Sequence, residues 1–127
     1  MKHSMLAGVR VLVLEDDAMI NLETCETLRA FGCGVSDFLH LHEAAAAVER
    51  ELPDIAVLDV NLHGKENSYA LAARLRDCGV PVVFLTGYDG SSLQAPWHDH
   101  PTVQKPCNSL ELRAALVRAL AAKSTNR

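Results

Sequence analysis

Acidic, hydroxyl and amine side chains stand directly after short apolar runs of this 127-residue chain, in the order Glu15, Asp16, Asp59, Thr86 and Lys105. Carboxylates held close together repel one another, and a bound divalent cation is one way to keep them ionised. Oxygen ligands suit Mg²⁺, which takes one or two carboxylates and keeps several waters. Such an ion beside a free carboxylate, a lysine and a hydroxyl is typical of a phosphoryl-transfer site.

The apolar runs before these residues are predicted to be strands. Val11–Leu14, Ile55–Leu58 and Val82–Leu85 are continuous rather than alternating, which is typical of parallel strands buried on both faces. Weaker strands are predicted at Val35–Leu39 and Thr102–Gln104. Ligands of an open parallel sheet bind beyond the carboxyl ends of its strands, so the chemistry-bearing residues are expected to share one crevice.

Helices are predicted between and after these strands. Apolar residues recur at helical spacing in four segments that contain Ile20, Leu41, Leu71 and Leu112. The last segment opens with Asn108 three residues before Glu111, an arrangement typical of a capping box. Glycine and prolines within Asp89–Pro101 predict only a short or irregular helix there. The alternation of strand and helix predicts a doubly wound α/β fold with helices on both faces.

Composition narrows the class of protein. Hydrophobic residues make up 49% of the chain, and 12 basic against 16 acidic residues leave a net charge of −4. This balance predicts neither nucleic acid nor an anionic membrane as partner. The chain has no apolar run of ~20 residues and no signal peptide, which predicts a cytoplasmic protein. The expected organisation is a flexible N-terminal tail over 1–8, one domain over 9–123 and a C-terminal tail over 124–127.

Four segments, taken together, resemble the receiver domain of two-component response regulators: Val11–Asp17, Val57–Asn61, Phe84–Tyr88 and Lys105-Pro106. They occur in the usual order and spacing, and the resemblance covers the chain from about residue 9 to residue 122. It implies a flavodoxin-like, five-stranded parallel sheet of order 2-1-3-4-5. The third segment is similar to the Phe-x-Thr-Gly-Tyr variant of a subgroup of stand-alone receivers.

The resemblance implies a phosphoacceptor and a metal site. Asp59 is the expected phosphoacceptor. Mg²⁺ (or Mn²⁺) is expected to bind Asp16 and Asp59 directly, Glu15 through water, and the backbone carbonyl of Asn61. A carboxylate reacts poorly with an anionic phosphoryl donor unless cations screen the repulsion, which the metal and a lysine would do.

The resemblance also implies switch residues and partners. Thr86 and Lys105 are expected to bind phosphoryl oxygens, and the bond between Lys105 and Pro106 is often cis in this family. Tyr88 and Asn61 stand at positions that tune dephosphorylation, and Tyr88 is a candidate switch residue. The expected donor is a histidine kinase or a histidine phosphotransfer protein. Output is expected through changed contacts with a downstream protein rather than enzymatic turnover; homodimerisation on phosphorylation stays open.

Departures from the common pattern support rival hypotheses. Glu15 replaces the usual first aspartate, His63 a usual proline, and Thr102 a switch aromatic. They favour, as the main alternative, a pseudo-receiver that acts as an interaction module without phosphorylation. The segment could also be a receiver excised from a larger hybrid kinase or regulator. A small aspartyl-phosphate phosphatase is disfavoured because Asn61 stands where such enzymes carry a second acid.

Two sequence features near the irregular segment allow more than one interpretation. Trp97 could pack this segment onto the sheet or form a partner patch together with Tyr88. The triplet His98-Asp99-His100 could suggest a metal motif, but no further ligand stands at a suitable spacing, so a solvated loop is favoured.

Overall fold

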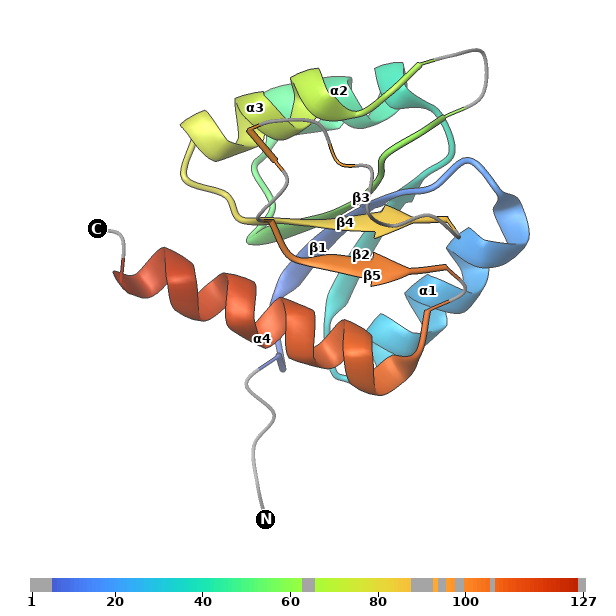
Figure 1. Ribbon diagram of the computed structural model, residues 1–127, viewed down its shortest axis with the longest axis vertical. Coiled ribbons are helices and arrows are strands. Elements are labelled where there is room, and N and C mark those ends of the chain that lie inside the picture. The colour runs from blue at the N-terminus through green and yellow to red at the C-terminus, as the bar shows by residue number, and fades with distance from the viewer. Residues whose placement is uncertain are drawn as a thin grey trace.

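A computed structural model describes residues 6–62, 66–87, 93, 96–97, 100–105 and 107–125, with the side chains of 124 and 125 excepted (Figure 1). The elements of this part follow in the order β1 (Arg10–Leu14), α1 (Ala18–Ala30), β2 (Gly34–Phe38), α2 (Leu41–Arg50), β3 (Ile55–Asp59), α3 (Tyr69–Asp77), β4 (Val82–Thr86), β5 (Thr102–Gln104) and α4 (Ser109–Thr125). The predictions for His63, Tyr88, His98, Asp99 and Pro106 concern positions outside the described residues.

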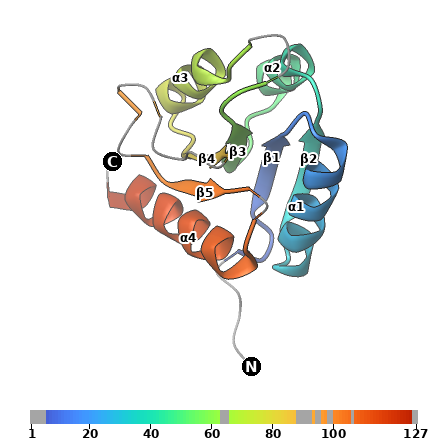
Figure 2. The ribbon, with the colours of Figure 1, turned by 45° about the vertical axis from the view of Figure 1, so that its right-hand side comes forward.

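The five strands form one parallel sheet of order β2-β1-β3-β4-β5, so the predicted flavodoxin-like fold is confirmed. Helices α1 and α4 cover one face, and α2 and α3 cover the other (Figure 2). No helix in the described part of the chain is long and apolar enough to cross a membrane.

The sheet separates two apolar cores because successive side chains of a strand point to opposite faces. In β1, Val11 and Val13 face the core under α1 and α4, whereas Leu12 and Leu14 face the core under α2 and α3. Every residue of β3 and β4 is buried. The continuous apolar runs of the sequence therefore mark the strands that are covered on both faces.

A polar side chain caps the N-terminus of each of the helices α1 and α4, the latter as predicted for Asn108. The Asp17 side chain accepts hydrogen bonds from the backbone N–H groups of Met19 and Ile20, both at 3.0 Å. The Asn108 side chain accepts from Leu110 at 2.8 Å and from Glu111 at 3.2 Å. Each cap satisfies N–H groups that have no partner within the helix.

The predicted tail boundaries need correction. The sequence placed residues 6–8 in the N-terminal tail, but Leu6 is fully buried in the core under α1 and α4. Its carbonyl accepts from Cys33 Sγ at 3.6 Å, and the Gly8 N–H donates to the Gly32 carbonyl at 2.9 Å. At the other end α4 continues to Thr125, into the predicted 124–127 tail. Leu6 contributes to the fold because an apolar side chain is stabilised by entering the core.

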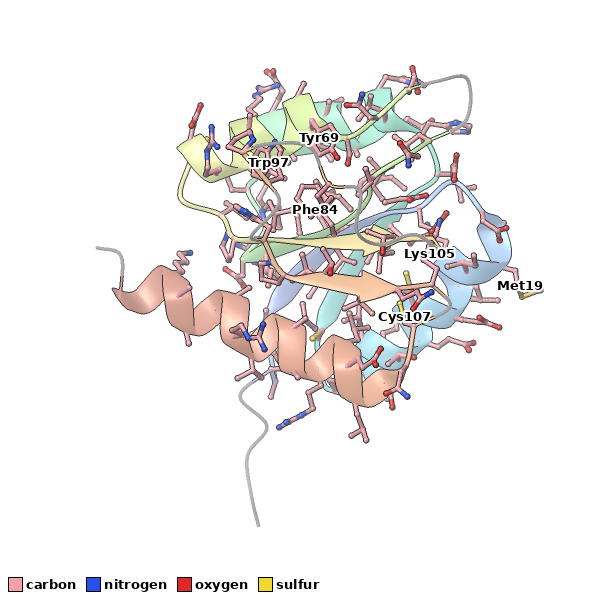
Figure 3. All side chains as sticks on the ribbon, viewed as in Figure 1. Met19, Tyr69, Phe84, Trp97, Lys105 and Cys107 are labelled. Atoms are coloured by element: carbon pink, nitrogen blue, oxygen red, sulfur yellow. The ribbon has the colours of Figure 1, made fainter. Side chains whose placement is uncertain are left out.

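Trp97 packs against the sheet and α3 (Figure 3). It is 4% exposed, and its ring centroid lies 5.6 Å from that of Phe84, 6.4 Å from that of Tyr69 and 4.7 Å from that of His100. The Arg76 guanidinium lies 4.8 Å from the indole centroid. Of the two interpretations left open by the sequence, packing of the irregular segment is therefore the one the structure supports.

Candidate functional site

The carboxyl ends of the strands bring the sequence-predicted residues to one edge of the sheet. Asp59 and Thr86 are the last residues of β3 and β4, and Lys105 directly follows β5. Backbone bonds from Val60 to Leu85 (3.1 Å) and from Lys105 to Thr86 (2.7 Å) continue the ladder past the strand ends. These residues share a cavity of about 160 Å³, which is lined by Asp59, Val60, Asn61, Thr86, Gly87, Leu93 and Lys105.

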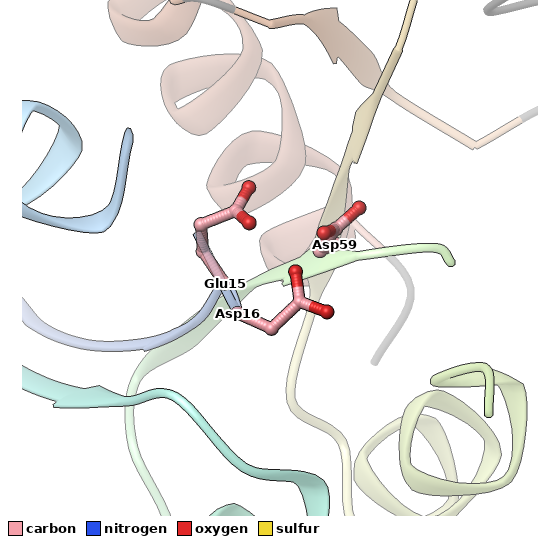
Figure 4. A group of neighbouring side chains, drawn as sticks. All are labelled: Glu15, Asp16 and Asp59. Atoms are coloured by element: carbon pink, nitrogen blue, oxygen red, sulfur yellow. The ribbon is translucent and has the colours of Figure 1, made fainter. Parts of the chain in front are cut away.

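Three carboxylates converge beside this cavity (Figure 4). One oxygen each from Glu15, Asp16 and Asp59 lies within 4.8 Å of the other two. Glu15 and Asp59 are buried, at 0% and 2% exposure, whereas Asp16 is half-buried and can be reached from solvent. An all-oxygen donor set with one accessible member fits a hard divalent cation such as Mg²⁺.

Lys105 faces two of the three acids. Its Nζ lies 3.0 Å from Asp59 Oδ2 and 3.1 Å from Glu15 Oε1, and its side chain is 18% exposed. Asp59 receives an aligned hydrogen bond from the lysine. Glu15 Oε1 is buried and receives no aligned hydrogen bond within the described part of the chain. This oxygen is therefore left with acceptor capacity that a cation or its water could use.

Burial makes the two inner carboxylates hard to ionise. Burial raises the pKa of Glu15 to about 7, opposed by the backbone N–H of Asp17 and by Lys105. Burial also raises the pKa of Asp59, opposed by its bond to Lys105. Burial alone would lower the pKa of Lys105, but its ion pairs with Asp59 and Glu15 outweigh this and raise it. One lysine does not neutralise three acids, so a further cation is favourable at this site.

The turn after β1 determines where the side chains of the acidic pair, Glu15 and Asp16, lie. Glu15 Oε2 accepts the Asp17 N–H at 2.8 Å, so the Glu15 side chain folds back toward its own backbone. The exposed Asp17 is engaged as the cap of α1 and is not among the three clustered acids. The two neighbouring acidic residues thus separate into a buried member and an accessible one.

The other predicted site residues lie around the phosphoacceptor position. Thr86 is 7% exposed and lines the same cavity as Asp59. Asn61, two residues after the predicted phosphoacceptor, is exposed and forms an antiparallel bridge with Asn67. Thr102, the residue at the usual switch-aromatic position, is exposed in β5.

Sequence reasoning missed Asn21. This asparagine is 2% exposed on α1, and its Nδ2 donates to the carbonyls of Glu15 and Phe38, both at 3.1 Å. It stands three and seven residues before Thr24 and Leu28, which are buried on the same face of α1. A polar residue in register with a buried helical face was the signal that could have identified it.

The comparisons with known proteins give matches among solved structures only. No family model matches the chain, and no curated protein does. SdrG from Sphingomonas melonis Fr1 is 31% identical over 94% of this chain and 99% of its own, with a TM-score of 0.76. A putative response regulator from Chloroflexus aurantiacus J-10-fl is 24% identical over 90% of this chain and 98% of its own, with a TM-score of 0.77.

A third structure is longer than this chain. The response regulator PhyR from Brucella abortus is 23% identical over 96% of this chain, with a TM-score of 0.80, and the match spans 51% of PhyR. At this identity the match shows the fold alone.

A five-stranded parallel sheet of order 2-1-3-4-5, with acids after β1 and β3 and a lysine after β5, defines an α/β domain of the receiver type. With the similarity to SdrG and to response regulators, the chain belongs to the receiver domain family of response regulators.

Proposed function

We propose that this receiver accepts a phosphoryl group on Asp59 in a Mg²⁺-dependent reaction and signals through changed protein–protein contacts. The donor we propose is a histidine kinase or a histidine phosphotransfer protein, and the domain acts as a phosphoacceptor rather than a turnover enzyme. The observation that carries this proposal is the buried Asp59 carboxylate, which is held 3.0 Å from Lys105 Nζ and within 4.8 Å of two further acids.

The reaction at Asp59 is a phosphoryl transfer. A carboxylate oxygen attacks the phosphorus of a phosphohistidine on the donor, and a new O–P bond forms while the P–N bond breaks. The electron pair leaves with the imidazole, which takes up a proton. Asp59 is left as a mixed carboxylic–phosphoric anhydride. The open cavity of about 160 Å³ beside Asp59 supplies room for the incoming group.

Positive charge must offset the anionic donor. Lys105 already lies against Asp59 and would keep an ion pair with the transferred group. Asp16 and Asp59 would hold Mg²⁺ directly, with Glu15 acting through water and Asn61 through its backbone carbonyl. The bound ion supplies charge neutralisation at the phosphoryl oxygens. Thr86, which lines the same cavity, offers a hydroxyl to a phosphoryl oxygen.

The output follows from the added charge. A phosphoryl group on Asp59 adds negative charge in the cavity and draws Thr86 and Lys105 toward it. Because Lys105 directly follows β5 and α4 begins four residues later, a shift of the lysine is passed to the surface of these two elements. We propose this surface as the place where phosphorylation changes partner contacts.

The test is the intact mass of the chain after incubation with acetyl phosphate and Mg²⁺. The wild type is expected to gain one phosphoryl group (~80 Da), and the gain is lost in Asp59→Asn and without Mg²⁺. Asp77→Asn is the matched control because Asp77 is an exposed aspartate at the end of α3, outside the acidic cluster. If neither acetyl phosphate nor a phosphohistidine donor gives an Asp59-dependent adduct, the domain is an interaction module without phosphorylation.

A further inference from the structure

Asn21 connects helix α1 to the turn that carries the acidic pair. Its side chain is 2% exposed, and each of its polar atoms has a partner. Nδ2 donates to the Glu15 carbonyl and to the Phe38 carbonyl, both at 3.1 Å, while Oδ1 accepts from Cys25 Sγ at 3.4 Å. The one amide group therefore joins α1 to the ends of β1 and β2.

The Glu15 carbonyl belongs to the peptide group that leads into Asp16. The pairing of β1 with β3 ends at Leu14, so this peptide lies beyond the ladder on that side. On the other side the Glu15 N–H donates to the Phe38 carbonyl at 3.1 Å. Asn21 supplies the second attachment, since it binds the carbonyls of both Glu15 and Phe38. Rotation of this peptide would move the Asp16 carboxylate relative to Glu15 and Asp59.

An asparagine suits this place better than the alternatives. An apolar side chain of similar size would take the amide donor from the buried Glu15 carbonyl and leave the Phe38 carbonyl with the Glu15 N–H. An aspartate would set a carboxylate against two carbonyl oxygens. Helix α1 is itself a firm support, because Leu28 and Cys25 are buried in the core and Asp17 caps its first turn.

We propose that Asn21 is a positioning residue for the divalent cation of this receiver. By fixing the peptide between Glu15 and Asp16, it holds the accessible carboxylate at the spacing that the cation needs. This inference rests on the proposed function, which supplies the cation site. Side chains that do not bind the metal but orient its ligands are often important for affinity. Their removal typically weakens metal binding by about 10–100-fold.

The experiment measures cation binding by the full chain, without phosphorylation. Mn²⁺ is titrated while the electron paramagnetic resonance signal of the free ion is followed, and Mg²⁺ affinity is obtained by competition. Asn21→Leu is expected to weaken binding of both ions about tenfold or more. Leu28→Ala, on the same helix and fully buried, is the control for lost stability and is expected to keep the Kd within about twofold.

A second variant keeps the inference testable where Asn21→Leu does not fold. Asn21→Ser retains one hydroxyl donor. We expect it to lose a measurable part of its affinity for both ions, but less than Asn21→Leu loses. Circular dichroism establishes that each variant is folded at the titration temperature. A folded Asn21 variant that binds both ions as the wild type does would overturn this inference alone. If the wild type binds neither ion, or binds them equally well after Asp16→Asn, the cation site itself is overturned, and this inference with it.

Discussion

Two clusters of ion pairs lie at opposite ends of the sheet, in different surroundings. At the amino end of β1, Arg10 pairs with Glu51 at 2.6 Å and with Asp54 at 3.6 Å. Beyond the carboxyl ends, Lys105 pairs with Asp59 at 3.0 Å and with Glu15 at 3.1 Å. In each cluster one cation pairs with two acids, and Asp16 lies as a third acid beside the Lys105 cluster. The Arg10 cluster is exposed, whereas the acids of the Lys105 cluster are buried.

The difference in burial decides in which direction the pKa values of the acids shift. The hydrogen bond from the Arg10 backbone N–H, together with the Arg10 side chain, holds the pKa of Asp54 below its usual range, as is normal for a paired surface acid. Burial outweighs pairing for Glu15 and Asp59, and their pKa values rise. Pairing alone therefore does not mark a functional acid. A functional acid is marked by burial together with pairing to too few cations to neutralise the local negative charge.

The largest expected effect is the loss of the lysine from the buried cluster. Lys105→Met removes a cation that faces the site of phosphoryl transfer, and we expect the phosphorylation rate to fall about 10²–10³-fold. Arg10→Met removes the corresponding cation of the exposed cluster and is expected to leave the rate unchanged. Initial rates of adduct formation by mass spectrometry compare the two. Equal effects of both substitutions would remove the functional contrast between the clusters.

The next effect is a pH dependence of stability in the absence of divalent cations. A carboxyl whose pKa is higher in the folded chain than in the unfolded chain binds more protons when folded, so stability falls as pH rises between the two values. With the pKa of Glu15 raised to about 7 from 4.5, the unfolding free energy is expected to fall between these pH values. The loss is up to about 3 kcal/mol, at about 1.4 kcal/mol per pKa unit.

Urea denaturation with a chelator measures this slope. Saturating Mg²⁺ should reduce it, because a cation stabilises the ionised acids, and Glu15→Gln should remove most of it. A wild-type slope equal to that of Glu15→Gln would show that burial of Glu15 has no energetic consequence.

The smallest effect is expected from the exposed cluster. Glu51→Gln removes one charge of an exposed pair, which is screened by water and salt. We expect the melting temperature to change by no more than about 2 °C, as followed by circular dichroism. A loss of many degrees would mean that the exposed cluster contributes to the fold as strongly as a buried one.

The sequence predicted the elements whose pattern is local. Continuous apolar runs identified β1, β3 and β4, and the residues directly after them identified the crevice, because parallel strands end at one edge. Asn108 was recognisable as a helix cap, since a cap depends on the next three residues. These features need no knowledge of distant contacts.

Features decided by distant contacts were harder to predict. Leu6 lies in a short segment with no strand or helix periodicity, and its burial depends on the core under α1 and α4. Asn21 is visible in the sequence as a polar residue on the buried face of a helix, but its role depends on the end of β2, seventeen residues away. Trp97 had two interpretations until its contacts with Phe84 and Tyr69 were known. In each case the partner lies outside the local window that a periodic pattern samples.

The central claim is that Asp59 itself carries the phosphoryl group. Borohydride reduces an aspartyl phosphate to homoserine, so reduction of the phosphorylated chain followed by tandem mass spectrometry reports the modified position. Homoserine is expected at position 59 in the Mg²⁺-treated wild type, with positions 15 and 16 unmodified. Modification at either of these acids, or on a histidine, with position 59 intact would contradict this claim.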